Sequence, residues 1–466
     1  MAKFWFLIVG FWFLFLPVGS AQDYIQVRAA AHISSSVSDG RYSLDDITRI
    51  CQKAGISVLF ITDRDIRLWE YGIWPLRRLI RRQVEDNSML GYGAQAYLED
   101  ITRFKHKSGL LIIPGAESAP FYYWQGKLFG LNLRMRDYHK HIIALGVKTS
   151  QDYLGLPVLG NPDGMSRGFN VWSTWPIFLI VVGLAVFKRS RKRALAMIIV
   201  GAVFALNNWP FNLEKFDQYH GYRGIMPYQM YIDYAGGRDI LTFWAHPEAA
   251  WHQSRGNIKI DTEPYSRYLL ESRDYTGFTV FPEGYNAVGK PGGIWDGLLN
   301  EYCGGFRKKP VWAIAGLGFD NQGKLEDALA GTQLFILTKD LSPVSVLDAV
   351  KGGRMYASTG PASADFRLDD FSVSDDSGEV RALCGETAVI PGRRVIKVSG
   401  GFRASAGPPA RIKVIKNGLT LKDETLIMPF SLTFEDSPSG GSMVYYRLDI
   451  SGEGVHLVTN PIFVKK

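Results

Sequence analysis

The stretch from Tyr24 to Gly40, YIQVRAAAHISSSVSDG, decides the fold class of this chain of 466 residues. It begins as an apolar run typical of a buried strand, and the run ends at His32. Small polar residues follow, and Ser38-Asp39-Gly40 predicts a turn. A histidine at a strand end and an aspartate seven residues later are typical of metal ligands, although Ser34 stands where a second imidazole is expected. The stretch therefore predicts either a working metal site or the remainder of one.

Further apolar runs of this kind alternate with amphipathic segments along the chain. One helix is predicted from Leu44 to Lys53, with Ser43 as its N-cap and Asp46 three residues further on. Runs rich in β-branched residues that alternate with helices predict an α/β fold with a parallel sheet covered by helices. Polar residues stand where the apolar runs end: His32, Asp63, Arg64, Glu117, His246, Glu283 and Asp320.

In a β/α barrel, chemistry is carried at the C-terminal ends of the strands. His141 departs from this pattern because it precedes its apolar run. A lone histidine at a strand end is more often structural, but two histidines, a glutamate and an aspartate at one barrel mouth favour a metal site. Nitrogen and oxygen ligands without thiolate suit Zn, Mn or Fe. The three cysteines have neither metal-ligand spacing nor the pattern of a disulfide framework.

Six segments taken in chain order, HISSSVSDG, FITDRD, IIPGAE, KHIIALG, FWAHP and GLGFD, resemble the metal motifs of the PHP (polymerase and histidinol phosphatase) superfamily of metallohydrolases. GGRMYASTGP from Gly352 and TNPIFV from Thr459 make the chain most similar to the CehA/McbA-like branch. The resemblance runs from about residue 24 to the C-terminus, apart from a central apolar insertion. It implies a distorted (β/α)7 barrel with up to three metals at its C-terminal mouth.

The resemblance implies an uneven set of metal ligands: Glu117, His141, His246, His32, Asp39 and Asp320. Three family histidines are replaced, by Ser34, Arg64 and Gln322. We expect one retained metal on Glu117, His141 and His246, which are two imidazoles and a carboxylate.

A second site on His32, Glu117 and Asp320 is weakened by the serine at position 34. At the third site we expect Arg64 to replace the ion and to pair with Asp39, since a guanidinium stays protonated and cannot ligate. One or two divalent ions are therefore expected.

Two residues are candidates for catalysis beside the metal. Metal-bound water has a pKa near neutrality, and the ion polarises a carbonyl or phosphoryl oxygen. Asp320 is the candidate general base if it is not itself a ligand. Arg64 is a candidate for binding the anionic oxygens of a substrate, and a simple ion pair with Asp39 or Asp63 is its alternative role.

Two segments predict contact with a membrane. The apolar run from Phe4 to Val18 predicts a signal peptide over residues 1–21 or, alternatively, an uncleaved anchor. Residues 171–211 contain two apolar runs around the basic loop 188–193, which predicts a transmembrane helical hairpin with a cytoplasmic loop. A buried hairpin in a soluble domain is the alternative. The lipid bilayer is thus an expected partner, and both globular parts are expected outside the cytoplasm, in the periplasm or on the outer face.

The rest of the chain is expected to form three parts. Residues 22–170 and 212–361 are the two halves of the barrel, and residues 362–466 are an immunoglobulin-like β-sandwich. In the sandwich, Asn417-Gly418 predicts a tight hairpin. The net charge is +8, of which the loop 188–193 contributes five, so no nucleic-acid partner is expected.

Two functions remain open at this point. The first is a membrane-anchored, extracytoplasmic metal-dependent hydrolase of a phosphoester, ester or amide bond in an unidentified small molecule. The second is a catalytically degenerate binding or scaffold protein of the cell envelope. The intact trio Glu117, His141 and His246 favours the enzyme, whereas the three lost histidines favour the scaffold.

Overall fold

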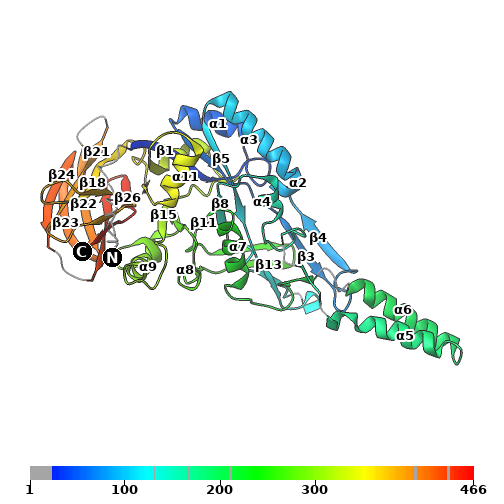
Figure 1. Cartoon of the computed structure of the whole chain (residues 1–466). Coiled ribbons are helices and arrows are strands. Elements are labelled where there is room, and N and C mark those ends of the chain that lie inside the picture. Colours follow the sequence, from blue (N-terminus) through cyan, green and yellow to red (C-terminus); the bar gives the residue numbers. More distant parts are fainter. Residues whose placement is uncertain are drawn as a thin grey trace, which may run out of the picture.

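The computed structural model describes residues 24–130, 132–164, 167–169, 171–208, 213–403, 407–437 and 441–466. The predicted signal peptide or anchor over residues 1–21 lies outside the described residues. Within them the chain is a mixed α/β structure with large sheets. Helices border the sheet at one end of the molecule, and a body of strands forms the other end (Figure 1).

One long sheet runs through both parts. Its strands, in spatial order, are β15 (Trp312–Ala315), β14 (Gly277–Phe281), β11 (Leu241–Trp244), β8 (Ile142–Leu145), β5 (Leu111–Ser118), β2 (Val58–Ile61), β1 (Ile25–Ile33), β16 (Thr332–Thr338), β17 (Met355–Thr359), β26 (Val455–Thr459), β25 (Met443–Gly452), β22 (Gly407–Lys416) and β23 (Leu419–Met428). Two more strands join at its side, β20 (Thr387–Val389) and β27 (Ile462–Lys465).

The helices lie between these strands in the chain. They are α1 (Leu44–Lys53), α2 (Met89–Tyr92), α3 (Ala94–Ser108), α4 (Ser150–Leu154), α5 (Trp175–Val186), α6 (Arg191–Asn207), α7 (Met226–Gly236), α8 (Tyr268–Glu271), α9 (Ile294–Cys303), α10 (Leu325–Gly331) and α11 (Pro343–Lys351). Three short turns of other helix types are η1 (Leu128–Gly130), η2 (Val171–Thr174) and η3 (Tyr285–Gly289). The helix predicted from Leu44 to Lys53 is confirmed as α1, and Ser43 caps it by accepting a hydrogen bond from the Asp46 amide at 3.2 Å.

The first seven strands of the sheet are not all parallel. Strands β1, β2 and β5 run parallel to one another, as do β11, β14 and β15, but β8 is antiparallel to both of its neighbours. The prediction of a parallel sheet is therefore wrong at β8. Because β8 is reversed, its N-terminal end lies at the edge of the sheet where its neighbours have their C-terminal ends.

The backbone after β15 pairs with the end of β1. The amide of Leu317 donates to the carbonyl of Ala31 at 2.8 Å, and the amide of Phe319 donates to that of His32 at 3.1 Å. The amide of Ser34 donates in return to the carbonyl of Phe319 at 2.9 Å. The end of β1 therefore lies beside the segment that follows β15. In the order of the sheet, however, these two strands are separated by β14, β11, β8, β5 and β2.

Two smaller sheets extend beyond the long sheet near its middle. One consists of β12 (Trp251–Arg255), β13 (Ile258–Thr262), β7 (Arg134–Arg136) and β6 (Tyr123–Gln125). The other is the hairpin of β3 (Leu68–Gly72) and β4 (Arg81–Glu85). A short pair, β9 (Arg167–Gly168) and β10 (Leu213–Glu214), lies between the α5–α6 hairpin and the body. The first of these sheets brings Trp251 to the site described below.

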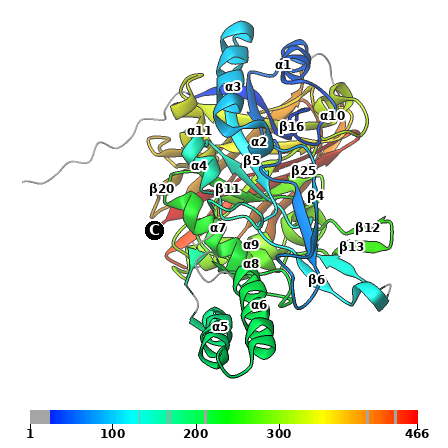
Figure 2. The same ribbon diagram turned by 90° about the vertical axis from the view of Figure 1, so that its right-hand side faces the viewer.

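Helices α5 and α6 form a hairpin that projects from the body of the protein (Figures 1 and 2). They approach closely at Gly183 and Gly201, where a Cβ would meet Ile198 Cγ1 at 2.8 Å and Ile180 Cγ1 at 2.7 Å. In place of the two predicted transmembrane spans, the structure has helices of 12 residues (α5) and 17 residues (α6). Among the helices of the described residues, none is long and apolar enough to cross a membrane.

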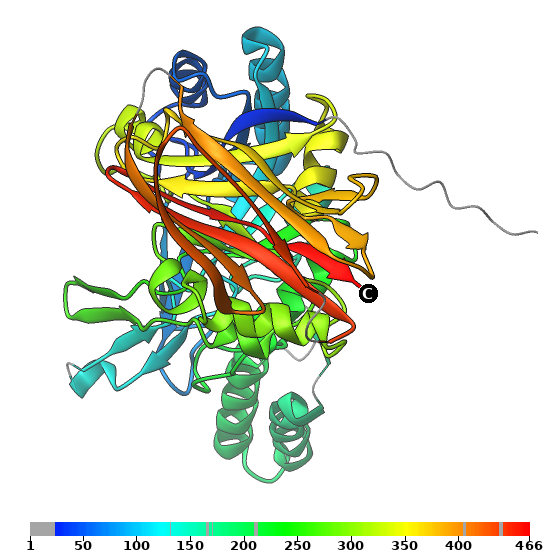
Figure 3. The same ribbon diagram turned by 90° about the vertical axis from the view of Figure 1, so that its left-hand side faces the viewer.

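The C-terminal residues form two sheets around a second apolar core (Figure 3). One is the far end of the long sheet, and the other has the order β19 (Arg381–Leu383), β18 (Phe366–Asp375), β21 (Arg394–Phe402) and β24 (Phe430–Asp436). Asn417 and Gly418 form the two-residue turn between β22 and β23, so that predicted hairpin is confirmed. Since β17 pairs with β26, the sheet passes without interruption from one part into the other.

A buried ion pair also joins the two parts. Arg447 of β25 donates to the carboxylate of Asp296 in α9 through Nε at 2.7 Å and through Nη2 at 2.6 Å. The two side chains are 0% and 2% exposed. The Asp296 carboxylate also accepts from the Tyr445 hydroxyl at 2.8 Å and from the Gly292 amide at 2.7 Å. This carboxylate therefore accepts from four donor groups of three residues in the contact between the helical and strand-rich parts.

Candidate metal centre

The predicted site residues meet at one edge of the long sheet. His32 is the next-to-last residue of β1, Glu117 lies near the end of β5, and His246 follows β11 by two residues. His141 directly precedes β8, and the reversal of that strand brings this residue to the same edge. The sequence pattern could not place His141, because strand direction is set by pairing with β5 and β11.

The Glu117 carboxylate lies at the centre of the site. Its Oε1 is 2.6 Å from His141 Nδ1, 3.2 Å from His32 Nε2 and 3.7 Å from His246 Nε2. His141 Nδ1 and His246 Nε2 are 3.1 Å apart. All four side chains are nearly buried. Three imidazole nitrogens therefore converge on one carboxylate oxygen in a place from which solvent is largely excluded.

Arg64 occupies the other side of this carboxylate. Its Nε is 3.2 Å from Asp39 Oδ2 and 3.5 Å from Glu117 Oε2, and its Nη1 is 2.7 Å from His141 Nε2. Arg64 therefore lies beside both Asp39 and Glu117, where we expected it in place of an ion. Its contact with His141 was not foreseen. Among the described residues Arg64 forms no ion pair with the alternative partner Asp63, which instead binds Ser35, Ser38 and Tyr97.

The charges of the site shift the pKa values of its members. Burial works against a charge on Glu117, but Arg64, and then His141 and His32, outweigh burial and hold the pKa of Glu117 well below its usual value. Burial, followed by the charge of Arg64, lowers the pKa of His141 to about 3. Burial would also lower the pKa of Arg64, yet Glu117 and Asp39 raise it. At neutral pH the site thus contains a carboxylate, a guanidinium and a neutral His141.

Two residues behind His246 orient its ring and backbone. The amide of His246 donates to Thr279 Oγ1 at 2.7 Å, and Nδ1 of the ring lies 3.1 Å from the Tyr265 hydroxyl. Tyr265 also accepts from the His141 amide at 3.4 Å and donates to the carbonyl of Ala245. The sequence analysis missed Tyr265 and Thr279, because nothing in the spacing of either residue indicates contact with a histidine.

The backbone at two of the histidines is unusual. His32 has a φ of 63° and His246 a φ of 30°, in the left-handed region that residues other than glycine rarely adopt. Such conformations cost energy and concentrate at functional sites. Beside His32, a Cβ on Gly316 would meet Thr279 Cγ2 at 2.9 Å and the His32 ring nitrogen Nδ1 at 3.2 Å. Position 316 therefore requires glycine if His32 is to keep its place.

Asp63 and Asp65 flank Arg64 but turn away from the metal ligands. Asp63 accepts from the Ser35 amide at 2.7 Å, from Ser38 Oγ at 2.6 Å and from the Tyr97 hydroxyl at 2.8 Å. Burial raises the pKa of Asp63, against these hydrogen bonds, and raises that of Asp65 to about 7. Asp63 therefore holds the loop that carries Asp39 in place.

A cavity of about 200 Å³ lies at the centre of the site and contains all of the predicted site residues. Its lining includes His32, Asp39, Arg64, Glu117, His141, His246 and Asp320, together with Ser34, Trp251 and Glu283. A neighbouring cavity of about 210 Å³ shares Asp39, Arg64, Trp251 and Asp320 with it. His139 and Gln322 line this second cavity. Trp251 was missed because it comes from a strand of a separate sheet.

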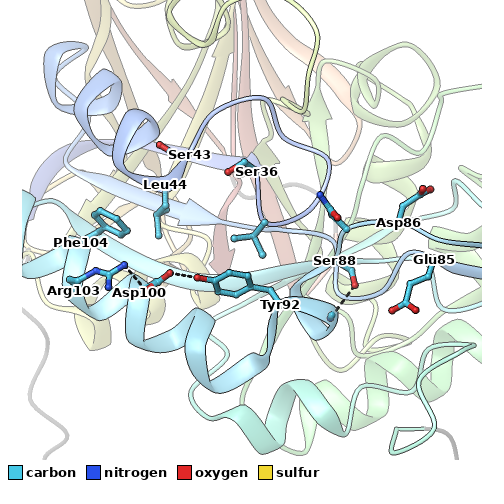
Figure 4. A pocket seen from close by; sticks show the side chains of 13 residues that line it. Ser36, Ser43, Leu44, Glu85, Asp86, Ser88, Tyr92, Asp100, Arg103 and Phe104 are labelled. Atoms are coloured by element: carbon cyan, nitrogen blue, oxygen red, sulfur yellow. Dashed lines mark hydrogen bonds and ion pairs between the residues drawn. The ribbon is translucent and has the colours of Figure 1, made fainter.

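A larger cavity of about 660 Å³ lies elsewhere, and none of the predicted ligands line it. Figure 4 shows Tyr92, Asp100 and Arg103 pointing toward one another in this cavity. The Tyr92 hydroxyl donates to Asp100 at 2.6 Å, and Arg103 Nη2 lies 2.6 Å from the same carboxylate. Since these polar groups already satisfy one another, the smaller cavity is the better candidate for chemistry.

The residues present fit a divalent ion. His32, Glu117 and His246 each offer one ligand atom, and these atoms lie within 4.8 Å of one another. Two imidazoles and one carboxylate are a ligand set found in catalytic zinc sites. The Tyr265 contact to His246 is the kind of second hydrogen bond that orients a ligating imidazole. Asp39 and Asp320 line the same cavity, but Asp39 already faces Arg64.

Acid is expected to destabilise the metal-free protein through His141. The folded pKa is about 3 and the unfolded pKa about 6.5, so between these values the unfolded chain binds more protons and stability falls as pH falls. This group alone should lower the free energy of unfolding by about 2 kcal/mol between pH 6.5 and pH 5. The lowered pKa of Glu117 contributes to the stability of the fold above about pH 4.5, and this contribution is lost as the pH falls below that value.

Urea unfolding of the metal-free protein at several pH values would measure this loss. The variant His141→Gln should lose about 2 kcal/mol less than wild type over the same interval. Equal losses in the two proteins would contradict the buried, neutral state of His141.

No protein-family model and no curated protein matches this sequence. Among solved structures, the chain is similar to a two-domain protein from Bacteroides vulgatus that contains a predicted PHP-like metal-dependent phosphoesterase. The identity is 12%, the coverage is 93% of both chains, and the TM-score is 0.37.

Two further structures are similar over shorter parts of the chain. A proposed metal-dependent phosphoesterase from Bifidobacterium adolescentis has 12% identity, 64% coverage of this chain, 89% of its own and a TM-score of 0.28. An amidohydrolase from Chromobacterium violaceum, with bound sulfate and no metal, has 11% identity, 63% coverage of this chain, 88% of its own and a TM-score of 0.29. These values do not place the chain in a family.

Proposed function

We propose that this protein is a metal-dependent hydrolase of a phosphoester, ester or amide bond, with a reduced site for one or two divalent ions. The observation that carries the proposal is the convergence of three imidazole nitrogens within 3.7 Å of Glu117 Oε1. These residues line a cavity that also contains the carboxylate of Asp320 and the guanidinium of Arg64.

The residues of the chain divide the chemical work between them. A divalent ion on Glu117 and the histidines would supply an activated water and polarise the scissile oxygen. Asp320 is the proposed general base: its Oδ1 accepts from the amides of Asn321 and Gln322, which leaves Oδ2 to accept a proton. Arg64 supplies positive charge beside the site, and Glu117 and Asp39 keep it in position.

The architecture proposed with this function is the distorted PHP-type barrel followed by an immunoglobulin-like sandwich. Seven strands, from β15 to β1, follow one another in the sheet that carries the site, and the hydrogen bonds between residues 317–319 and 31–34 support closure of this set. The two sheets around the second apolar core support a sandwich. Membership of the CehA/McbA-like branch is part of the same proposal and rests on the sequence motifs.

Hydrolysis assays test the proposed reaction. Protein loaded separately with Zn, Mn or Fe would be assayed with phosphodiesters, aryl esters and carbamates. We expect metal-dependent hydrolysis of one of these classes, with kcat reduced about 100-fold or more in Asp320→Asn, which cannot act as the base. Stoichiometric metal binding without hydrolysis of any class would contradict the proposed enzyme.

The alternative is a catalytically degenerate binding or scaffold protein. A specific observation favours it, because Arg64 is engaged with Asp39, Glu117 and His141 together and so leaves one family metal position without ligands. A protein of this kind would bind less than about a tenth of an equivalent of metal, with no difference between wild type and His246→Ala.

We also propose that the α5–α6 hairpin contacts a lipid bilayer. Its apolar side chains face solvent, with Trp172 82% and Phe178 69% exposed. Five exposed cations stand at its tip, in residues 188–193, where they suit anionic headgroups. At its base, Asn207 binds the loop before β4 through the Pro75 carbonyl and the Arg78 amide. That loop adds Trp74, which is 75% exposed.

Vesicle flotation tests this contact. Wild type should float with vesicles that contain phosphatidylglycerol, and a variant with Phe178 and Leu184 changed to Asp should not. Leu419→Asp is the control, since Leu419 is also an exposed apolar residue, at 77%, but lies on β23. Failure of wild type to float would contradict the proposal. The extracytoplasmic location remains a separate proposal, for which a reporter fused at Thr242 should be exported and one at Ser190 should not.

A further inference from the structure

Both ring nitrogens of His141 already have partners. Nε2 lies 2.7 Å from Arg64 Nη1, and Nδ1 lies 2.6 Å from Glu117 Oε1. A guanidinium can only donate, so Nε2 must accept from Arg64 and cannot carry a hydrogen. The hydrogen of the neutral ring is therefore on Nδ1, from which it is donated to Glu117. The lone pair that His141 would need for a metal is used by Arg64.

His246 has the opposite arrangement. The Tyr265 hydroxyl has one hydrogen, which it donates to the Ala245 carbonyl. Its oxygen must therefore accept from His246 Nδ1, 3.1 Å away, so this nitrogen carries the hydrogen. His246 Nε2 therefore carries the lone pair, and it lies 3.7 Å from Glu117 Oε1. It is also 3.1 Å from His141 Nδ1, but the hydrogen of that nitrogen goes to the nearer acceptor, Glu117 Oε1, at 2.6 Å. Tyr265 thus prepares His246 as a ligand.

His32 completes a set without His141. Its Nε2 lies 3.2 Å from Glu117 Oε1, and its ring is stacked on that of His246 with centroids 5.8 Å apart and planes at 18°. Its Nδ1 lies against the backbone at Gly316, which directs the other nitrogen toward Glu117. The ligand atoms of His32, Glu117 and His246 lie within 4.8 Å of one another.

We propose that Arg64 is a positioning residue that withdraws His141 from metal binding, so that the ion is held by His32, Glu117 and His246. His141 then serves as a hydrogen-bond donor that orients the Glu117 carboxylate. This inference rests on the proposed metal-dependent function and changes its ligand set. In the ligand set expected from the sequence, Glu117, His141 and His246, His141 is thus exchanged for His32. The sequence could not indicate this, because no sequence pattern shows which ring nitrogen of a histidine is free.

Nitrogen-15 NMR of histidine-labelled protein tests the first step without metal. The chain has only eight histidines, so the spectrum is sparse, and His141→Gln assigns the signal. We expect the Nδ1–H form for His141 in wild type. In Arg64→Met the acceptor nitrogen is released, and the signal should change to the other form or to a mixture. An Nε2–H form in wild type would overturn the inference, whether or not the protein binds metal.

Arg67→Met is the matched control for this step. Its guanidinium also lies near Asp39, with Nε 3.9 Å from Oδ2, and it lines the neighbouring cavity. No contact of Arg67 with His141 is present among the described residues. The His141 signal should therefore stay in the Nδ1–H form. The same change in both variants would show that the loss of any nearby cation is sufficient and would overturn the specific role of Arg64.

Cadmium-113 added to the labelled protein tests the second step. Scalar coupling to the metal is expected on the His32 and His246 signals and not on that of His141. In Arg64→Met, or in Arg64→Leu if that variant does not fold, we expect coupling to appear on His141 as well. Coupling to His141 in wild type would overturn the inference while leaving the proposed function intact. No cadmium binding at all would overturn both.

Discussion

Replacement of His246 by alanine is expected to abolish divalent-metal binding while the protein stays folded. His246 Nε2 lies 3.7 Å from Glu117 Oε1, and Tyr265 holds the His246 ring in the ligating orientation. Removal of the ring leaves one imidazole and one carboxylate, too few for a structured site. The affinity for the metal should fall by more than about 100-fold, which exceeds the loss expected when a residue that only hydrogen-bonds to a ligand is removed.

The measurement is metal content by mass spectrometry after dialysis against a known free-metal concentration. Wild type should hold about one equivalent and His246→Ala less than about a tenth. His252→Ala is the control, because His252 is mostly exposed and pairs with Asp261 at 3.2 Å, outside the cavity. Circular dichroism establishes that each variant is folded. Metal retained in His246→Ala would remove this histidine from the ligand set and with it the proposed centre.

Replacement of Asp296 by alanine is expected to destabilise the whole protein by about 3 to 5 kcal/mol. The cause is the buried Arg447, whose guanidinium is 0% exposed and stacks 4.7 Å from the ring of Trp295. Without its carboxylate partner this charge remains in an apolar surrounding, and the Tyr445 hydroxyl loses its acceptor as well. Since the pair joins α9 to β25, the contact between the two parts of the chain should weaken first.

Equilibrium unfolding in urea at pH 7 would measure this loss. Asp423→Ala is the matched control, since Asp423 also accepts two hydrogen bonds from an arginine, Arg411, but the pair is exposed and should matter little. The double variant Asp296→Ala/Arg447→Met should recover part of the stability, because it removes the stranded charge. A loss in Asp296→Ala no larger than in the control would contradict the structural role of the buried pair.

Local sequence signals predicted individual elements well and their assembly less well. Helix α1 and the turn at Asn417-Gly418 were predicted because a capping serine and an Asn-Gly pair each act within a few residues. The all-parallel sheet was wrong because strand direction depends on partners far away in the chain. The hairpin of residues 171–211 was recognised from its apolar runs, but the lengths of its helices were not.

The same division holds for the site. The sequence by itself predicted candidate metal ligands, among them His32, Glu117 and His246, because these residues stand at the ends of apolar runs and such ends meet at one edge of a sheet. It also determined that Arg64 replaces a possible ligand with a permanent positive charge.

Only the tertiary structure decided how these groups share their hydrogens. The reversal of β8 places His141 between Arg64 and Glu117, and Tyr265, in the loop between β13 and α8, accepts from His246 Nδ1 and so leaves Nε2 as the ligating nitrogen. A lone pair is available to an ion only if no neighbouring donor uses it. Which donor lies beside a given lone pair depends on contacts between strands and loops that can be more than a hundred residues apart, as His141 and His246 are. No local sequence pattern predicts such contacts.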